Sequence, residues 1–228
     1  SFRPLLRGSV IEQYLIKWNG DHWISYGEQL AAPRDPEIFD ADEKIVIRQT
    51  GDSLIAALDR EQFVVRNNMH AILPKKEKYM LSFILSVINS TFSNWYYQEI
   101  INPEKGEALA EVKKGHIIQL PVPSLDSNFI GDKVSFSSEE EIPTCIEDCN
   151  TILDTQDPDL ELSQKYDQIV LLSECMGVVK EERHKLNLNL LDYLGSVGNG
   201  PKLAEMNLIP RQDVSSSILS ETTKQRDK

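Results

Sequence analysis

The stretch KIVIRQTGDSLIAALDREQFVVRNNMHAILPKK, residues 44–76, carries the clearest strand signal in the chain. Apolar and β-branched residues gather in short runs, which we expect to be strands at about 44–48, 53–58, 62–66 and 69–73. Turn-forming residues separate these runs at Gly51-Asp52, Asp59-Arg60-Glu61 and Asn67-Asn68. Strands joined by such short connections pair in the antiparallel sense, so the stretch predicts an antiparallel sheet.

The N-terminal flank adds further strands. Residues 10–16 are β-rich, and residues 18–27 predict a hairpin in which Asn19-Gly20 supplies the turn. Aromatic residues lie on both sides of that turn, and we interpret them as packing of the hairpin rather than as a stacking surface. Residues 30–43 contain two prolines and five acidic residues and predict a loop.

On the C-terminal flank the periodicity changes to that of a helix. Apolar residues spaced three and four apart predict one helix from about 78 to 100. The segment HIIQLPVP at 116–123 predicts a short edge strand that two prolines end. Residues 1–125 therefore predict an α+β unit, mostly antiparallel β, with one long packed helix.

After Ser124 the composition becomes polar and acidic, and residues 126–141 predict a linker. We expect helices at about 139–154, 159–176 and 178–194. The predicted organisation is therefore the α+β unit at 1–125, an α-helical spacer or packing region at 126–210 and a flexible tail at 211–228.

The charge of the chain is unevenly distributed. The formal net charge is −12, of which residues 1–125 contribute −2 and residues 126–228 contribute −10. Taken as a whole the chain is too acidic for a typical nucleic-acid binder, because binding to phosphates needs a basic surface. The acidity belongs mostly to the C-terminal part, so the N-terminal unit is not excluded from that class.

Catalytic and membrane signals are missing from the sequence. It contains no Gly-rich phosphate loop, no H-E-x-x-H, no G-x-S-x-G and no Asn-Pro-Pro-aromatic motif. The cysteines, Cys145, Cys149 and Cys175, favour a reducing cytoplasm, and we interpret them as small buried side chains rather than metal ligands. No apolar run is long enough to span a membrane. We therefore expect a cytoplasmic binding module without a catalytic centre or cofactor of its own.

Several segments, in order, resemble one known family. They are LLRGSVIEQYLIKW (5–18), WISYG (23–27), KIVIRQTGDSLIAALD (44–59), NNMHAILP (67–74), YMLSFILSVINSTFSNWYY (79–97) and KKGHIIQLPVP (113–123). Together they resemble the TaqI-like C-terminal specificity domain, the target recognition domain of adenine-N6 DNA methyltransferases and fused type II restriction–modification enzymes. The resemblance covers about residues 5–123.

This resemblance implies a domain that docks in the major groove of double-stranded DNA and selects the sequence to be methylated. It also implies a partner, an N-terminal methyltransferase domain that binds S-adenosylmethionine. Since the chain begins at Ser1 and lacks the motifs of that domain, we expect it to be the recognition portion of a larger enzyme. The resemblance does not fix which residues contact bases.

The candidate DNA-binding residues come from strand ends, turns and the start of the predicted helix. They are Arg48, Gln49, Thr50, Arg66, Asn67, Asn68, His70, Lys75, Lys76 and Lys78. Arg48 either contacts phosphate or guanine or pairs locally with Asp52 or a carbonyl group. Asn67-Asn68 is consistent both with reading adenine and with an ordinary turn. The lysines at the helix start gain nothing from the helix dipole, which favours a phosphate contact.

Two other functions stay open at this stage. The acidic helices at 139–194 would serve as the working surface of a protein–protein interaction module, with a homodimer as one form of it. A cryptic nuclease is less favoured, because the chain holds no nuclease motif of the PD…(D/E)xK form.

Overall fold

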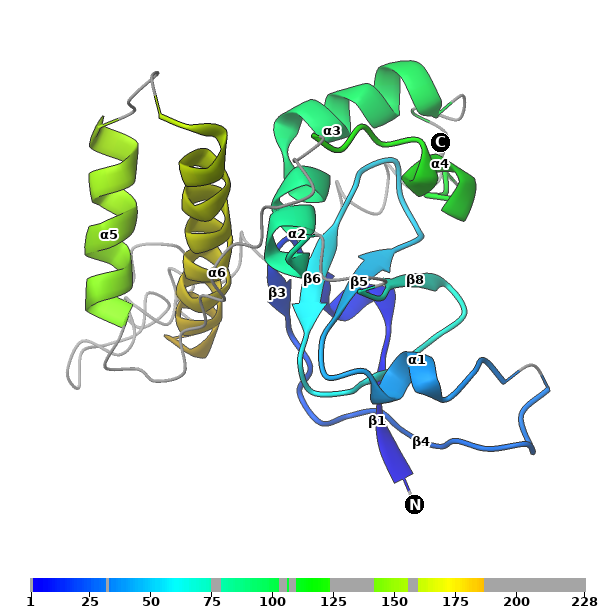
Figure 1. Cartoon of the computed structure of the whole chain (residues 1–228). Helices are drawn as coiled ribbons and strands as arrows, with labels where there is room; N and C mark the ends of the chain where they lie inside the picture. Colours follow the sequence, from blue (N-terminus) through cyan, green and yellow to red (C-terminus); the bar gives the residue numbers. More distant parts are fainter. Residues whose placement is uncertain are drawn as a thin grey trace, which may run out of the picture. The chain divides into compact units, whose positions relative to one another are not determined.

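Figure 1 shows a computed structural model of the chain, which describes residues 2–31, 33–74, 79–102, 106, 110–123, 142–155 and 160–186. The chain divides into two compact units, Ser1–Glu181 and Glu182–Lys228. The predicted linker and tail lie outside the described residues. The predicted domain boundary at residue 125 falls there too and stays a prediction.

The predicted antiparallel sheet is the centre of the first unit. β5 (Lys44–Arg48) is its middle strand, flanked by β6 (Ala56–Asp59) and β8 (Met69–Ile72). Both partners run antiparallel to β5, with Ile45 opposite Leu58 in β6 and opposite Ile72 in β8. Residues 45–47 of β5 are all fully buried, because the core covers both faces of this strand. A strand buried on both faces is a continuous apolar run rather than an alternating one.

The N-terminal strands pair differently from the prediction. β1 (Phe2–Leu6) pairs antiparallel with β4 (Trp23–Ser25) and parallel with β7 (Val64–Val65). The strand predicted at 62–66 therefore does not join the antiparallel sheet of β5, because its partner is β1. The hairpin predicted at 18–27 is therefore wrong in its pairing, because β4 finds its partner in β1. The Asn19-Gly20 turn itself is present, with Gly20 at a φ of +80°.

The β-rich segment at 10–16 does form strands, as two short ones rather than one. A 3-10 turn, η1 (Gly8–Val10), is followed by a small hairpin of β2 (Ile11–Glu12) and β3 (Leu15–Ile16). Tyr14 turns the chain between them with a φ of 65°, and its backbone N–H donates to Ala56 O at 2.8 Å. The β-rich pattern predicts an extended conformation for Tyr14, but this residue forms the turn and is bonded to β6.

The single helix predicted at 78–100 is three consecutive helical segments. They are α2 (Leu81–Asn89), α3 (Thr91–Tyr96) and a π-helical turn, η2 (Tyr97–Ile101). Ser90 breaks the first from the second, because its ψ of 149° is extended and its Oγ accepts the N–H of Ser93 as an N-cap. The helical class of this stretch is thus confirmed, and its continuity is not.

Asn89 joins this helical layer to the sheet. It is a buried side chain at the end of α2, and its amide forms two hydrogen bonds with the backbone of Ala56 in β6. Its Nδ2 donates to Ala56 O at 3.0 Å, and its Oδ1 accepts from Ala56 N at 3.1 Å. The side-chain amide therefore pairs with β6 as a neighbouring strand would.

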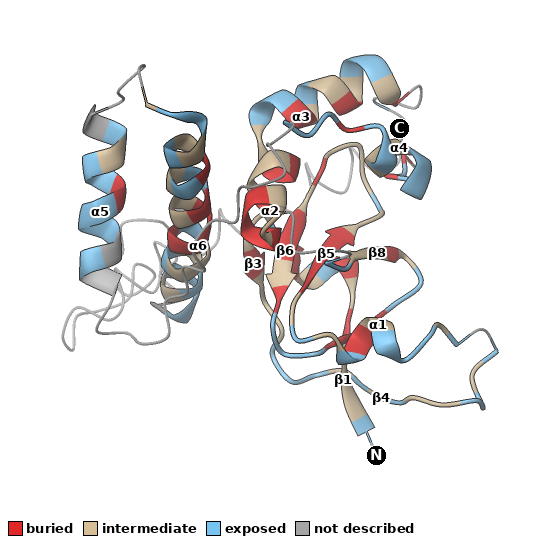
Figure 2. Ribbon diagram, in the orientation of Figure 1, coloured by how far each residue is buried: buried red, intermediate tan, exposed pale blue. Residues whose placement is uncertain are grey.

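Two apolar clusters lie on the two faces of the sheet. Figure 2 shows buried residues in β5 and β6 and in α2 and α1 (Glu37–Asp40) beside them. Ile45 and Ile47 belong to the cluster under α2, whereas Val46 belongs to the cluster with β1 and α1. The alternation of side chains along β5 assigns them to these opposite faces. Lys44, fully buried at the start of β5, forms an ion pair of 2.7 Å with the carboxylate of Asp59.

The edge strand predicted at 116–123 is wrong: the structure has a short helix, α4 (Lys114–Ile118). Lys113 N–H donates to Nδ1 of His116 at 3.2 Å at its start, which supports the first turn. The adjacent β-branched residues Ile117 and Ile118 favoured a strand interpretation. In the structure Ile117 packs on the cluster under α2, so a tertiary contact decides the local conformation.

The predicted C-terminal helices are present as far as residue 186, and two of them are one helix; residues 187–194 lie outside the described part of the chain. α5 (Ile142–Thr155) is followed by α6 (Leu162–Leu186), which replaces the separate helices predicted at 159–176 and 178–194. Gly177 lies inside α6, where a Cβ atom would come within 3.7 Å of Tyr14 O. Cys149 of α5 and Cys175 of α6 are buried in one small cluster, as predicted for these cysteines.

α6 contacts the sheet and its helical layer at three places. The guanidinium of Arg60 donates to both carboxylate oxygens of Glu174, at 2.9 and 2.7 Å. The ring of Tyr166 lies 4.5 Å from the ring of Phe83, and its hydroxyl accepts the N–H of Met80 at 2.7 Å. Lys180 donates to Gln13 O at 2.8 Å. Burial of Arg60 opposes its charge, but the hydrogen bonds and charges of Glu174 and Glu43 outweigh this and raise the pKa of the guanidinium.

Candidate nucleic-acid interface

The described candidate residues gather where β5 ends and β8 begins. Arg48, the last residue of β5, lies opposite Met69, the first residue of β8. Gln49 and Thr50 follow Arg48 directly, and the 66–70 tip, defined as residues 66–70, precedes and enters β8. The sheet register therefore brings these two groups of candidates together. Lys75, Lys76 and Lys78 lie outside the described residues.

The backbone of the 66–70 tip is held by an arginine from another loop. Arg34 Nη2 donates to Asn67 O at 3.1 Å and to Met69 O at 3.0 Å. Within the tip, Met69 N donates to Arg66 O at 3.1 Å. Arg34 is therefore engaged with main-chain carbonyl groups, which fixes the tip without using its side chains.

The side chains of the tip differ in exposure. Arg66 and Asn67 are exposed, and neither side chain has a hydrogen bond or an ion pair within the part of the chain that the structure describes. Asn68 is half-buried, and its Oδ1 is a buried atom without a hydrogen-bond partner among the described residues. An unpaired buried carbonyl is costly unless a ligand or water satisfies it, so the tip retains acceptor and donor capacity.

His70 connects β8 to the segment before α4. Its Nε2 lies 2.7 Å from Val112 O. Since a carbonyl oxygen only accepts, Nε2 must carry the proton, and Nδ1 of the neutral ring is then an acceptor. The candidate His70 thus has a structural bond on one nitrogen and free capacity on the other.

The same segment adds residues that the sequence did not indicate. Thr50 forms a β-bridge with Glu111, and Gln49 Nε2 donates to Glu111 Oε2 at 3.0 Å. Val112 N donates to Gln49 O at 2.7 Å, which fixes the two backbones beside each other. More than sixty positions separate Gln49 from Glu111, and no local pattern relates them. Lys113 and Lys114 follow immediately and bring two cations to this side of the sheet.

Arg48 is half-buried, and its aliphatic stem packs against Gly8, where a Cβ atom would lie 3.3 Å from Arg48 Cγ. The alternative pairing with Asp52 or a carbonyl does not occur within the described part of the chain, because the guanidinium makes no hydrogen bond or ion pair there. Asp52 instead accepts from Ser53 Oγ at 3.1 Å. The packed stem positions a charge that retains its donors, as a phosphate contact requires.

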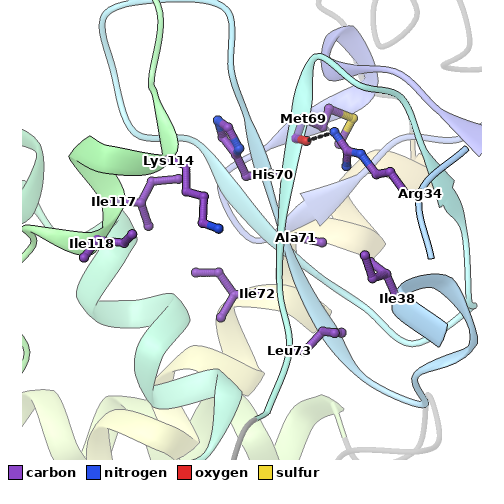
Figure 3. Close-up of a pocket in the computed structure, with 10 residues that line it drawn as sticks. All are labelled: Arg34, Ile38, Met69, His70, Ala71, Ile72, Leu73, Lys114, Ile117 and Ile118. Atoms are coloured by element: carbon purple, nitrogen blue, oxygen red, sulfur yellow. Dashed lines mark hydrogen bonds between the residues drawn. The ribbon is translucent and has the colours of Figure 1, made fainter. Parts of the chain in front are cut away.

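A groove of about 400 Å³ runs beside this region along β8 (Figure 3). Residues 69–73 form its floor, Arg34 and Ile38 line one side, and Lys114, Ile117 and Ile118 line the other. No group of three potential metal ligands occurs among the described residues. No helix in the described ranges combines the length and apolarity needed to cross a bilayer.

Comparison with known families matches residues 3–122 to the TaqI-like C-terminal specificity domain. The chain belongs to this family. The match includes every described strand, apart from Phe2 at the start of β1, and ends just after α4, so all the described candidate residues lie within the TaqI-like domain. This family supplies the DNA-recognition module of methyltransferase-type enzymes and is a specificity domain rather than a catalytic one. No curated protein matches the chain.

Proposed function

We propose that this TaqI-like domain selects the target sequence of an adenine-N6 DNA methyltransferase in a type II restriction–modification system. The observation that carries the proposal is the family match, which spans the whole sheet and the surface formed by the ends of β5 and β8. That surface combines side-chain donors, an oriented carboxylate and an amide with an unpaired acceptor, the groups that read base edges in a major groove.

The candidates divide by the contact for which each is suited. Arg48 and Arg66 present guanidinium donors and would contact phosphate or guanine. Asn67, Asn68 and the Gln49–Glu111 pair present amide and carboxylate groups that match adenine and cytosine edges. Lys75, Lys76 and Lys78 stay in the proposal as phosphate contacts, on the strength of the sequence alone.

The remaining chemistry would belong to the parent enzyme. We propose that a methyltransferase domain N-terminal to this one binds S-adenosylmethionine and transfers the methyl group, and that an endonuclease is fused to it in some forms. The enzyme and its DNA would share the cytoplasm. This chain would select the DNA sequence that is bound and would position it for the methyltransferase domain.

Salt-dependent binding of duplex DNA tests the proposal. We expect fluorescence anisotropy with a labelled duplex pool to show weak affinity that falls as salt increases, because phosphate contacts release counterions. Arg66→Ala should reduce the slope of log K against log salt by about one. Lys17→Gln is a matched control, because that cation pairs with Glu12 on the β2–β3 hairpin.

Two outcomes would contradict the proposal. One is an affinity that does not depend on salt or on the residues of the 66–70 tip. The other is a parent enzyme that methylates the same sites at the same rate after this segment has been deleted.

The alternative function is a dimerisation module acting through α5 and α6. Exposed apolar residues on these helices favour it, among them Leu153 at 52% and Met176 at 44%. Light scattering of the whole chain would show a dimer that Leu153→Lys and Met176→Lys convert to monomer. A monomer at all concentrations would exclude this alternative, and DNA recognition by the sheet is compatible with either result.

A further inference from the structure

We propose that the groove along β8 is a strand-addition site for an extended apolar polypeptide segment that carries acidic residues at its ends. This inference does not rest on DNA recognition. It rests on the outer edge of β8, which no other described strand pairs, on the apolar residues that line the groove from both faces of the sheet, and on the charges at its sides.

The sheet register shows which backbone groups of β8 face the groove. Arg48 N donates to Ile55 O, on the β6 side, so alternate residues of β5 direct their backbone groups to β8. The hydrogen-bonded pairs with β8 are then Ile47 with His70 and Ile45 with Ile72. The N–H and C=O of Ala71, which lies between those two residues, must point away from β5 into the groove.

Arg34 independently confirms this direction. Met69 is two residues before Ala71 and has the same orientation, and its carbonyl accepts from Arg34 in the groove. A side-chain donor thus already occupies the outer edge of β8 at one end. No described residue outside β5 donates to or accepts from the backbone of Ala71. An unpaired edge of this kind is a template for another strand.

The groove straddles the edge of the sheet rather than lying on one face. Ala71 packs with the cluster that contains Val46, whereas Ile72 packs with the opposite cluster, and both line the groove. Ile38 extends the wall on the first side and Ile117 extends it on the second. An added strand sends alternate side chains to opposite faces, so each apolar wall would receive every second side chain.

Charge selects the chemistry of the added segment. Arg34 and Lys114 line opposite sides of the groove, and none of its lining residues is acidic. Lys114 has no ion pair or hydrogen bond through its side chain within the described part of the chain. Figure 3 shows its side chain extending toward the space above Ile72. An apolar segment with carboxylates at its ends would pair those carboxylates with the two cations and pack its apolar side chains against the apolar lining of the groove.

NMR titration of the whole labelled chain with the blocked peptide Ac-Glu-Val-Ile-Val-Glu-NH2 tests the site. We expect the Ala71 and Leu73 amide signals to shift and their hydrogen exchange to slow. Ala71→Pro removes the outward N–H and leaves the bonds to β5 intact, as proline on an edge strand can. It should weaken binding by about tenfold or more, since the added strand loses a hydrogen bond and is obstructed.

Lys114→Glu provides a test that leaves the backbone unchanged. It should weaken binding of the acidic peptide and strengthen binding of Ac-Lys-Val-Ile-Val-Lys-NH2. The proposal is overturned if the peptide leaves the Ala71 and Leu73 amide signals unchanged while it shifts others. It is also overturned if both variants bind the peptide as the wild type does, provided that unchanged β5 and β6 signals show that the variants are folded. Protection of the Ala71 amide by duplex DNA, with no effect of the acidic peptide, would assign the groove to DNA instead and also overturn it.

Discussion

Asn89 shows how a single side chain joins a helix to a sheet in this fold. Its amide replaces a strand beside β6 by bonding to both the N–H and the C=O of Ala56. Asn89→Ala would leave the buried N–H of Ala56 without an acceptor, so we expect a loss of about 2–3 kcal/mol in the free energy of unfolding. Urea denaturation followed by circular dichroism measures it.

Asn94→Ala is the matched control. Among the described residues, the side chain of Asn94 accepts one backbone N–H, that of Leu54 at 3.0 Å, and the bond is partly buried. We therefore expect it to cost about half as much, roughly 1 kcal/mol. Equal losses of unfolding free energy in the two variants would show that the second hydrogen bond of Asn89 adds nothing to stability.

Glu111 determines how the amide of Gln49 is presented. Because one Nε2 hydrogen is donated to Glu111, the second hydrogen and Oε1 are left in a fixed orientation for a base. Under the proposed DNA recognition, Glu111→Ala should reduce discrimination against a changed target base by about 1–3 kcal/mol. Competition assays with the parent enzyme and single-base variants of its site measure this, and nonspecific binding should not weaken.

At the scale of elements, α6 is tied to the sheet through Glu174. Glu174→Ala leaves Arg60 with only Glu43, and we expect a loss of about 1–2 kcal/mol, below the cost of a fully buried pair because Arg60 remains 43% exposed. Hydrogen exchange should accelerate in α6 before it does so in β5. Glu182→Ala, which removes the exposed pair with Lys185, should have little effect on stability.

Tyr166 makes the same attachment sensitive to alkaline pH. Burial raises the pKa of its phenol, although the hydrogen bond from the Met80 N–H opposes this shift. A raised pKa in the folded state stabilises the fold below the unfolded value of about 10, and this contribution is lost as the pH rises through the folded value. Melting temperatures from pH 9 to 11 should therefore fall more for the wild type than for Tyr166→Phe. Parallel curves would refute this.

The elements also show what sequence can predict. The strands at 44–48 and 69–73 were predictable because apolar runs between turn residues are a local signal. The break at Ser90 was not predictable, because the apolar spacing continues through it and nothing in the sequence distinguishes this capping serine from the other serines nearby. The continuity of α6 through Gly177 was not predictable either, because a glycine is an ordinary signal for the end of a helix.

For the whole molecule, family membership could be predicted and the composition of the site only in part. The ordered segments identified the domain, and the sheet register brought Arg48 and the 66–70 tip together as separate turns of one sheet. Arg34, Glu111 and Val112 reach the site from loops whose paths depend on tertiary packing. Their contacts are with backbone carbonyl groups or with residues far away in sequence, so neither composition nor local spacing predicts them.

The grip of Arg34 on the 66–70 tip has a consequence for engineering. Because Arg34 bonds to the carbonyl oxygens of Asn67 and Met69, its hold does not depend on which side chains the tip carries. Residues 66–68 can therefore be randomised as an exchangeable cassette on a constant scaffold. A library at these three positions should yield folded proteins at high frequency, whereas the same library combined with Arg34→Ala should not.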